Sequence, residues 1–210
     1  MIKAILLVFD SARTWDSIAE DKRSVSGILF TFLLPLLLLT SAAEGYGLMT
    51  WGKRWVNQVL LETRTYTLQE VITYEVVQLL VALVVVFVGA VLVKALGETF
   101  HGRHSYTQTF TAVAYGLSPL FLLRLLDAFP VISPWLSWGV GMALSAMILY
   151  HGIPRVMMPD PPHAFGLFLT STLLLTITTA LTRFITYLWL QGKFKKVDVM
   201  FSEIIGRLQL

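Results

Sequence analysis

The stretch LLVALVVVFVGAVLV, from Leu79 to Val93, has no polar side chain. It is the centre of a longer apolar block, Val71–Leu96, and about 20 apolar residues in a helix suffice to cross the hydrocarbon core of a bilayer. Lipid offers the backbone no hydrogen-bonding partner, so such a block must be helical. We therefore predict a transmembrane helix here and expect its middle, Leu79–Val93, to face lipid.

Four other apolar blocks lie along the chain, at Gly27–Ala43, Thr109–Phe129, Val131–Tyr150 and Ala164–Leu190. The last three are long enough to cross a bilayer, and the first is long enough if its helix continues past Glu44 to Met49. The pattern predicts an all-α fold, a polytopic membrane protein with five transmembrane helices and amphipathic N- and C-terminal segments.

The composition excludes several classes of protein. Charged residues make up only 14% of the chain and hydrophobic ones 56%, whereas a soluble domain carries about 25% charged residues. The net charge of +3 is spread out without a basic stripe, so we expect no nucleic-acid partner. The absence of cysteine excludes disulfides and thiol catalysis. The expected partners are the lipid bilayer and other integral membrane proteins.

The apolar blocks divide the chain into a leader at 1–26, a five-helix transmembrane domain at 27–190, and a tail at 191–210 that is basic first and then amphipathic. The leader carries four apolar residues on one helical face: Ile2, Ile5, Leu6 and Phe9. Asp10 or Ser11 can cap a second short helix. Such a leader either lies on the membrane surface or packs on the bundle, and both interpretations stay open here.

Prolines and small residues mark the breaks between the blocks. Ser118 and Pro119 lie inside the third block and should kink that helix at mid-depth. Phe129-Pro130 forms a tight turn, which predicts an antiparallel hairpin of the third and fourth helices. We expect a loop from Trp51 to about Glu70 and a rigid, proline-rich loop at His151–His163.

Five charged residues fall inside the predicted spans: Glu44, Glu75, Arg124, Asp127 and Arg183. Following the alternation of the spans, all five lie in the leaflet that faces the C-terminus. Arg124 and Asp127 can pair on one helix because they are spaced i, i+3, and Arg183 can reach the headgroups or an acidic partner. Charges inside spans are costly, so the group is either a polar cavity for a substrate or ion or a structural charge network.

The fifth block carries a polar stripe made of Thr172, Thr176, Thr179 and Thr186, with Arg183 among them. The stripe either lines a pathway or packs against neighbouring helices, since threonine hydroxyls bond to carbonyls of the preceding turn. The four histidines lie in loops on the opposite side, with spacings that match no metal motif. No catalytic or phosphate-binding motif is present, so we expect no cofactor, no metal and no enzymatic activity.

The segment Ser105–Pro119, SYTQTFTAVAYGLSP, resembles the Yip1 family of five-span membrane proteins, in which a polar S/T-x-x-Q leads into a helix reading VAYxxxP. Other matching features follow in the same order: the Phe129-Pro130 turn, Ala143-Leu144-Ser145, Leu149-Tyr150-His151-Gly152, and a last helix that starts at Ala164-Phe165. The leader segment Thr14–Glu20, TWDSIAE, is similar to that of bacterial members.

Two features depart from the family pattern. The usual YxGL ends here as Tyr150-His151-Gly152-Ile153, and the long N-terminal extension of eukaryotic members is missing, which suggests a prokaryotic relative. The resemblance implies a five-helix bundle with a cytoplasmic N-terminus and a role in organising membranes or membrane proteins. It offers no catalytic residues.

Two hypotheses about function follow. The first is a non-enzymatic integral membrane protein that acts through helix–helix contacts as a scaffold, an assembly factor or a small subunit of a membrane complex. The alternative is a transporter or channel for a small solute or ion that uses the kinked third helix and the charge cluster. We expect the bacterial plasma membrane as the location. Lys and Arg divide equally between the two sides, and only Lys22 and Arg23, directly before the first helix, favour a cytoplasmic N-terminus.

Overall fold

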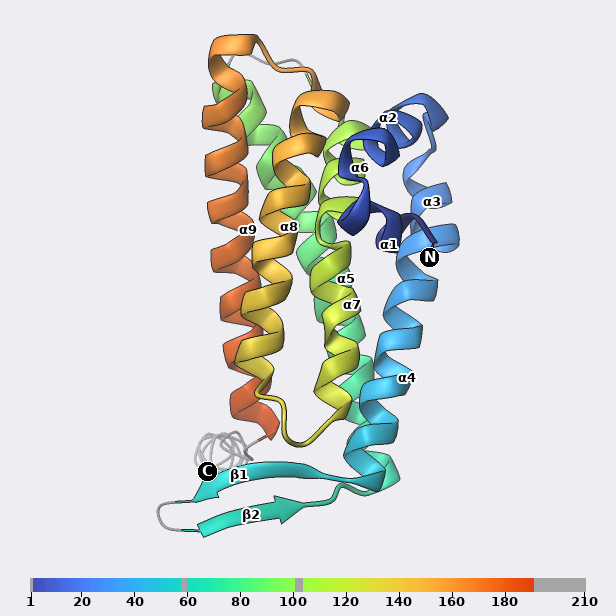
Figure 1. Ribbon diagram of the computed structural model, residues 1–210, viewed down its shortest axis with the longest axis vertical. Helices are drawn as coiled ribbons and strands as arrows, with labels where there is room; N and C mark the ends of the chain where they lie inside the picture. Colours follow the sequence, from blue (N-terminus) through green and yellow to red (C-terminus); the bar gives the residue numbers. More distant parts are fainter. Residues whose placement is uncertain (1, 58–59, 101–103, 191–210) are drawn as a thin grey trace, which may run out of the picture.

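A computed structural model describes residues 2–57, 60–100 and 104–190 as a bundle of long helices that run roughly parallel to one axis (Figure 1). In these ranges five segments are long and apolar enough to cross a membrane: Val25–Thr50, Leu68–Thr99, Tyr106–Ala128, Pro134–Met157 and Pro161–Trp189. The predicted all-α class and the five membrane-spanning helices are therefore confirmed. The predicted tail, 191–210, lies outside the described residues.

The first span consists of α3 (Val25–Ile28), a π-helical turn η1 (Leu29–Leu33) and α4 (Leu34–Thr50). Ser24 caps its start by accepting a hydrogen bond from the Gly27 amide at 3.2 Å. Pro35 has no amide hydrogen to donate, and its ring would crowd the carbonyl of the preceding turn. The wider π-helical turn before it accommodates both effects. The helix continues past Glu44 to Thr50, as the longer version of the block requires.

The second and third spans each begin with a reciprocal cap. The α5 helix (Leu68–Thr99) starts with Thr67 and Glu70, and α6 (Tyr106–Gly116) starts with Ser105 and Gln108. In each pair the side chain of one residue bonds the backbone amide of the other, which satisfies two free donors. After Leu117 the third span continues as α7 (Ser118–Leu123) and the 3-10 turn η2 (Arg124–Ala128). The span is thus interrupted directly before Ser118 and Pro119.

The fourth and fifth spans, α8 (Pro134–Met157) and α9 (Pro161–Leu190), are longer than their apolar blocks. The predicted loop at His151–His163 is wrong, because only residues 158–160 separate the two helices. Pro161 stands at the start of α9, where a missing amide costs nothing. Pro154 lies in the last turns of α8 without ending the helix.

The predicted loop after the first span is also wrong in part. Strands β1 (Lys53–Asn57) and β2 (Leu60–Arg64) pair antiparallel, with Lys53 opposite Arg64 and Asn57 opposite Leu60. This hairpin lies at one end of the bundle, next to the turn between α7 and α8 (Figure 1). It is a small addition to a helical fold.

The leader forms two short helices, α1 (Ile2–Phe9) and α2 (Ser11–Asp21), that pack on the bundle. The α2 helix buries Trp15 and Ile18 and contacts α8. Asp10 occupies the N-cap position of α2 but makes no side-chain cap bond. Four apolar residues of α1 point away from the bundle: Ile2, Ile5, Leu6 and Phe9. The predicted face exists, and the bundle contact is made by the opposite face of α1, through Ala4 and Leu7.

The middle of α5 has two faces. Val85, Val86 and Ala90 belong to the core, whereas Val84 and Val88 are exposed. The expectation that all of Leu79–Val93 faces lipid is therefore wrong for one side of the helix. A uniformly apolar sequence carries no mark of which side packs, so its composition could not separate the core face from the lipid face.

Candidate functional site

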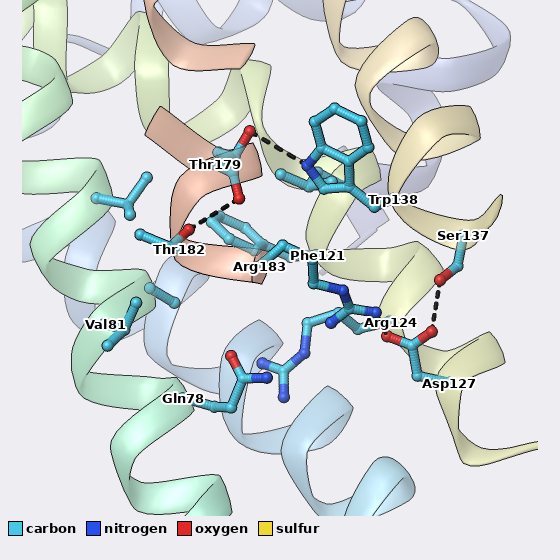
Figure 2. Close-up of a pocket in the computed structure, with 13 residues that line it drawn as sticks. Gln78, Val81, Phe121, Arg124, Asp127, Ser137, Trp138, Thr179, Thr182 and Arg183 are labelled. Atoms are coloured by element: carbon cyan, nitrogen blue, oxygen red, sulfur yellow. Dashed lines mark hydrogen bonds and ion pairs between the residues drawn. The ribbon is translucent and has the colours of Figure 1, made fainter. Parts of the chain in front are cut away.

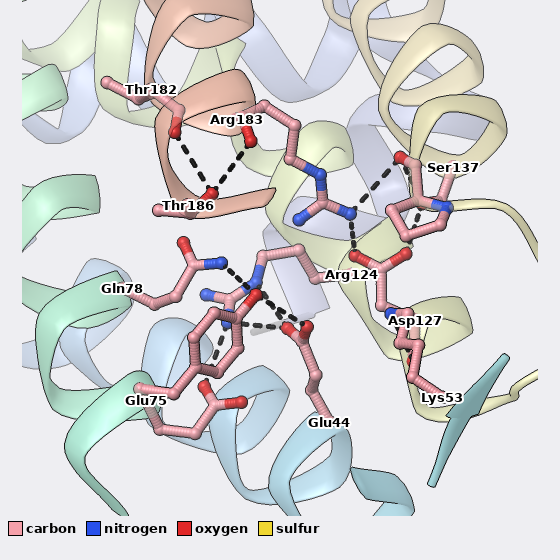
Figure 3. A network of polar contacts seen from close by, with 12 residues as sticks. Glu44, Lys53, Glu75, Gln78, Arg124, Asp127, Ser137, Thr182, Arg183 and Thr186 are labelled. Carbon is pink, nitrogen blue, oxygen red and sulfur yellow. Dashed lines mark hydrogen bonds and ion pairs between the residues drawn. The ribbon is translucent and has the colours of Figure 1, made fainter. Parts of the chain in front are cut away.

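Glu44 is the centre of a buried charge cluster. Its side chain is fully buried, and its Oε2 accepts hydrogen bonds from Nη2 and Nε of Arg124, at 2.8 and 3.1 Å. The same Nη2 donates to Oε2 of Glu75 at 3.0 Å. Figure 3 shows the guanidinium of Arg124 between the two carboxylates, which come from α4 and α5. One arginine thereby joins the first three spans.

Asp127 is the second centre, and it pairs with the guanidinium of Arg183 on α9. The Ser137 hydroxyl, on α8, donates to the other carboxylate oxygen of Asp127. Lys53 is buried, and its Nζ donates to the backbone carbonyl of Asp127 at 3.3 Å. Asp127 therefore connects the third span with the last two spans and with the hairpin.

The pairing predicted within the third span is wrong. Arg124 and Asp127 each take a partner from another helix rather than each other. Glu44 and Arg183 are buried at the same level of the bundle, and a buried charge left unpaired is far more costly than a lost helix-surface pair. The long-range pairs therefore prevail.

Two side chains extend the cluster along α5. Nε2 of Gln78 donates to the Tyr74 hydroxyl at 2.6 Å, and that hydroxyl donates to Oε1 of Glu44 at 3.3 Å. Three members of the site are not among the residues predicted from the sequence: Tyr74, Ser137 and Lys53. Tyr74 directly precedes a charged residue in a span, which is a usable signal. Lys53 lies in the connecting segment, and nothing in the local sequence marks it.

Gly47 sets the distance between α4 and η2. A Cβ atom at this position would lie 2.2 Å from the Ala128 carbonyl oxygen and 2.6 Å from its Cα. A side chain at 47 would therefore push the two segments apart. Because Glu44 is one helical turn before Gly47, this close approach holds Glu44 within reach of Arg124.

Most hydroxyls of the threonine stripe form hydrogen bonds within their own helix, α9. The hydroxyls of Thr176, Thr179 and Thr186 donate to carbonyls four residues earlier, at 2.7, 2.8 and 3.1 Å. Two contacts of Thr179 reach α8: Nε1 of Trp138 donates to its Oγ1 at 3.3 Å, and that hydroxyl lies 3.9 Å from the Sδ of Met142. The buried hydroxyl of Thr172 has no partner in the part of the chain that the structure describes. Of the predicted stripe, Thr179 and Arg183 are among the residues that line the cavity shown in Figure 2.

A second cluster unites the residues that carry the family resemblance. Trp15 is fully buried, its indole Nε1 donates to the Ile148 carbonyl at 3.0 Å, and its ring meets Tyr115 edge-on at 6.3 Å. The indole occupies the space where a Cβ of Gly152 would stand, 2.4 Å away. Next to this cluster, the Ser118 hydroxyl donates to the Tyr115 carbonyl at 2.7 Å. The motif residues of the leader, α6 and α8 thus form one packing unit.

Among the described residues, no group of three His, Asp or Glu side chains is placed to hold a metal ion. The family model for the Yip1 domain matches residues 5–184, a range that contains all six charged residues of the cluster and the Trp15 packing unit. Comparisons with curated proteins and with solved structures gave no match. On this match, the chain belongs to the Yip1 family of membrane proteins.

Proposed function

We propose that the chain is a non-enzymatic integral membrane protein that acts through helix–helix contacts, as a scaffold, an assembly factor or a small subunit of a membrane protein complex. The observation that carries this proposal is the outer face of α8, where Gly139 and Ala143 stand one turn apart. Within residues 2–57, 60–100 and 104–190, a Cβ at Gly139 would meet nothing within 4 Å, and Ala143 is exposed. Small residues at this spacing allow a partner helix to approach closely in lipid.

Other small residues of α8 serve the bundle itself. A Cβ at Gly141 would lie 2.9 Å from the Leu120 Cα, and Ser145 is fully buried. The small residues of this helix therefore divide between an inner and an outer face. The apolar side chains beside the outer pair, Val140 and Met147, are exposed as well. Packing inside the chain explains Gly141 and leaves Gly139 and Ala143 without a function.

The test is a variant with Gly139→Leu and Ala143→Leu, compared with the wild type by mass spectrometry of proteins that copurify in mild detergent. The matched control is Val84→Leu with Val88→Leu, an exposed pair at the same spacing on α5. We expect the α8 variant to lose a stoichiometric membrane partner that the wild type and the control retain, at unchanged melting temperature. Equal recovery of partners by all three proteins would contradict the proposal.

A cavity beside the charge cluster favours the second candidate, a transporter or channel for a small solute or ion. Arg124 and Arg183 line this cavity. If it conducts, Arg124→Gln and Arg183→Gln should abolish chloride or proton flux into dye-loaded proteoliposomes while assembly stays intact. Under the first proposal these variants loosen folding, and the wild type gives no flux above empty liposomes.

We further propose that the protein resides in a bacterial plasma membrane with its N-terminus in the cytoplasm. Lys22 and Arg23 stand directly before the first span, and positive residues at that position favour the cytoplasmic side. An N-terminal tag should then be protected from protease in intact spheroplasts. Digestion of the tag in intact spheroplasts would show that the N-terminus lies outside the cytoplasm.

A further inference from the structure

The cavity beside the charge cluster lies between α5, α7, η2, α8 and α9 (Figure 2). Charged and polar side chains next to the ion pairs line part of it: Arg124, Asp127, Ser137 and Arg183. Apolar side chains form much of the remaining wall, among them Val81, Val85, Leu120 and Phe121. A cavity lined by both charged and apolar side chains suits an amphiphilic molecule.

Both arginines that line the cavity carry a buried donor without a partner. Among the described residues, Nη1 of Arg124 and Nε of Arg183 make no hydrogen bond, although the two side chains are only 9% and 10% exposed. Buried donors without partners are rare and call for an explanation. Two guanidinium groups that line one cavity are well suited to oxygen atoms of a carboxylate or phosphate.

An apolar crevice lies beside the cavity, between α5 and α9. These helices touch where Leu175 lies against Gly89, and the rings of Tyr74 and Trp189 stack at 5.6 Å nearer the hairpin end. Between these two contacts the crevice has a volume of about 280 Å³. Val81 and Thr182 line both the cavity and the crevice, so the two spaces are adjacent and only these side chains need to move for a chain to pass between them.

We infer that this site binds an acidic amphiphile, with an anionic oxygen head on Arg124 and Arg183 and an acyl chain that leaves between α5 and α9. The cavity itself is small, about 60 Å³, which suits a compact head and the first methylenes. The larger crevice takes the rest of the chain. The inference stands apart from the proposed partner surface on α8, which lies on the outer face of the bundle.

Glu75 sets the affinity of the site for an anion. When all six groups are charged, the carboxylates of Glu44, Glu75 and Asp127 balance Arg124, Arg183 and Lys53. Glu75 shares its arginine with Glu44, and its Oε1 has no hydrogen-bond partner among the described residues. A neutral amide at this position would leave the site with a net positive charge. Glu75→Gln should therefore tighten the binding of an acidic head.

The experiment is native mass spectrometry of the full chain in detergent, titrated with a single-chain phosphate monoester, lysophosphatidic acid. Lysophosphatidylcholine, which has the same chain with a zwitterionic head, is the comparison. Oleate tests a carboxylate head, and inorganic phosphate tests an anion without a chain. We expect lysophosphatidic acid or oleate to bind at least about tenfold more tightly than lysophosphatidylcholine, and inorganic phosphate not to bind.

Two variants locate the site. Ala82→Phe fills the cavity without touching a charge, and Ala95→Phe places the same side chain on an exposed part of the same helix. Binding should fall at least about tenfold in Ala82→Phe, stay unchanged in Ala95→Phe, and rise several-fold in Glu75→Gln. Equal affinity for the acidic and zwitterionic amphiphiles, equal effects of the two phenylalanines, or tight binding of phosphate alone would overturn the inference. The Gly139→Leu, Ala143→Leu variant should bind the amphiphile normally, which separates this result from the α8 test.

Discussion

At the scale of single residues, several glycines stand where any side chain would overlap a neighbouring segment, and two of them hold the two clusters together. Gly47 faces the backbone of Ala128, and Gly152 faces the indole of Trp15. The first contact positions Glu44 for its ion pair, and the second leaves room for the indole that donates to Ile148. Gly152 belongs to the motif that resembles the family. The missing side chain leaves the space in which Trp15 of the leader packs against α8.

Gly152→Ala should therefore destabilise the protein, because the new methyl group forces the indole away and the packing around it is tight. Overpacking of this kind costs about 1–3 kcal/mol. Gly139→Ala, on the same helix, meets open space and should change stability by less than about 1 kcal/mol.

The stability of the two variants in detergent can be compared by steric trapping or by thermal denaturation. A Gly152→Ala protein as stable as Gly139→Ala would show that the contact between Trp15 and α8 is looser than described.

At the scale of elements, hydropathy predicted where the spans lie but not how they begin, end or pack. The spans themselves follow from length and apolar content. The hairpin at Lys53–Arg64 was missed because its strands are short and mixed in charge, without a clear alternation of apolar residues. The sequence did not predict that α8 continues past Tyr150, because a proline such as Pro154 usually ends a helix. Within a span, neighbouring groups can compensate for the backbone hydrogen bond that a proline cannot make.

A pair of charges joins the two helices of the leader to each other. Nζ of Lys3 on α1 donates to Oδ2 of Asp21, at the end of α2, at 2.5 Å. This hydrogen bond and the positive charge of Lys3 lower the pKa of Asp21 below its ordinary value of 3.8. A lowered carboxyl pKa means that the pair stabilises the fold above that ordinary value, and that the contribution is lost as pH falls through the lowered pKa.

Lys3→Met should accordingly loosen α1 at neutral pH and make no difference in strong acid. Hydrogen exchange of α1 peptides, compared with wild type at the same pH, measures this local opening. Arg13→Met is the control, since the Arg13–Asp10 pair is long, at 3.8 Å, and Arg13 is 90% exposed. If the two variants exchange alike at neutral pH, the Lys3–Asp21 pair does not hold α1.

At the scale of the whole molecule, the charge cluster joins all five spans. Arg124 connects α4, α5 and η2, while Asp127 connects η2 with Ser137 of α8 and Arg183 of α9. Sequence alternation placed the five charged residues in one leaflet, because the order of the spans fixes depth. It could not give their partners, because the rotation of each helix about its axis depends on packing that a uniformly apolar sequence does not encode.

The central claim is that the buried charges stabilise one another across helices, and a double-mutant cycle on unfolding free energy tests it most directly. For Glu44→Gln with Arg124→Gln, the pair is in contact, so we predict a coupling energy of about 1–3 kcal/mol. For Arg124→Gln with Asp127→Asn, the pair that the local spacing favours, the coupling should be clearly smaller. Additive effects at Glu44 and Arg124, or a larger coupling between Arg124 and Asp127, would contradict the account.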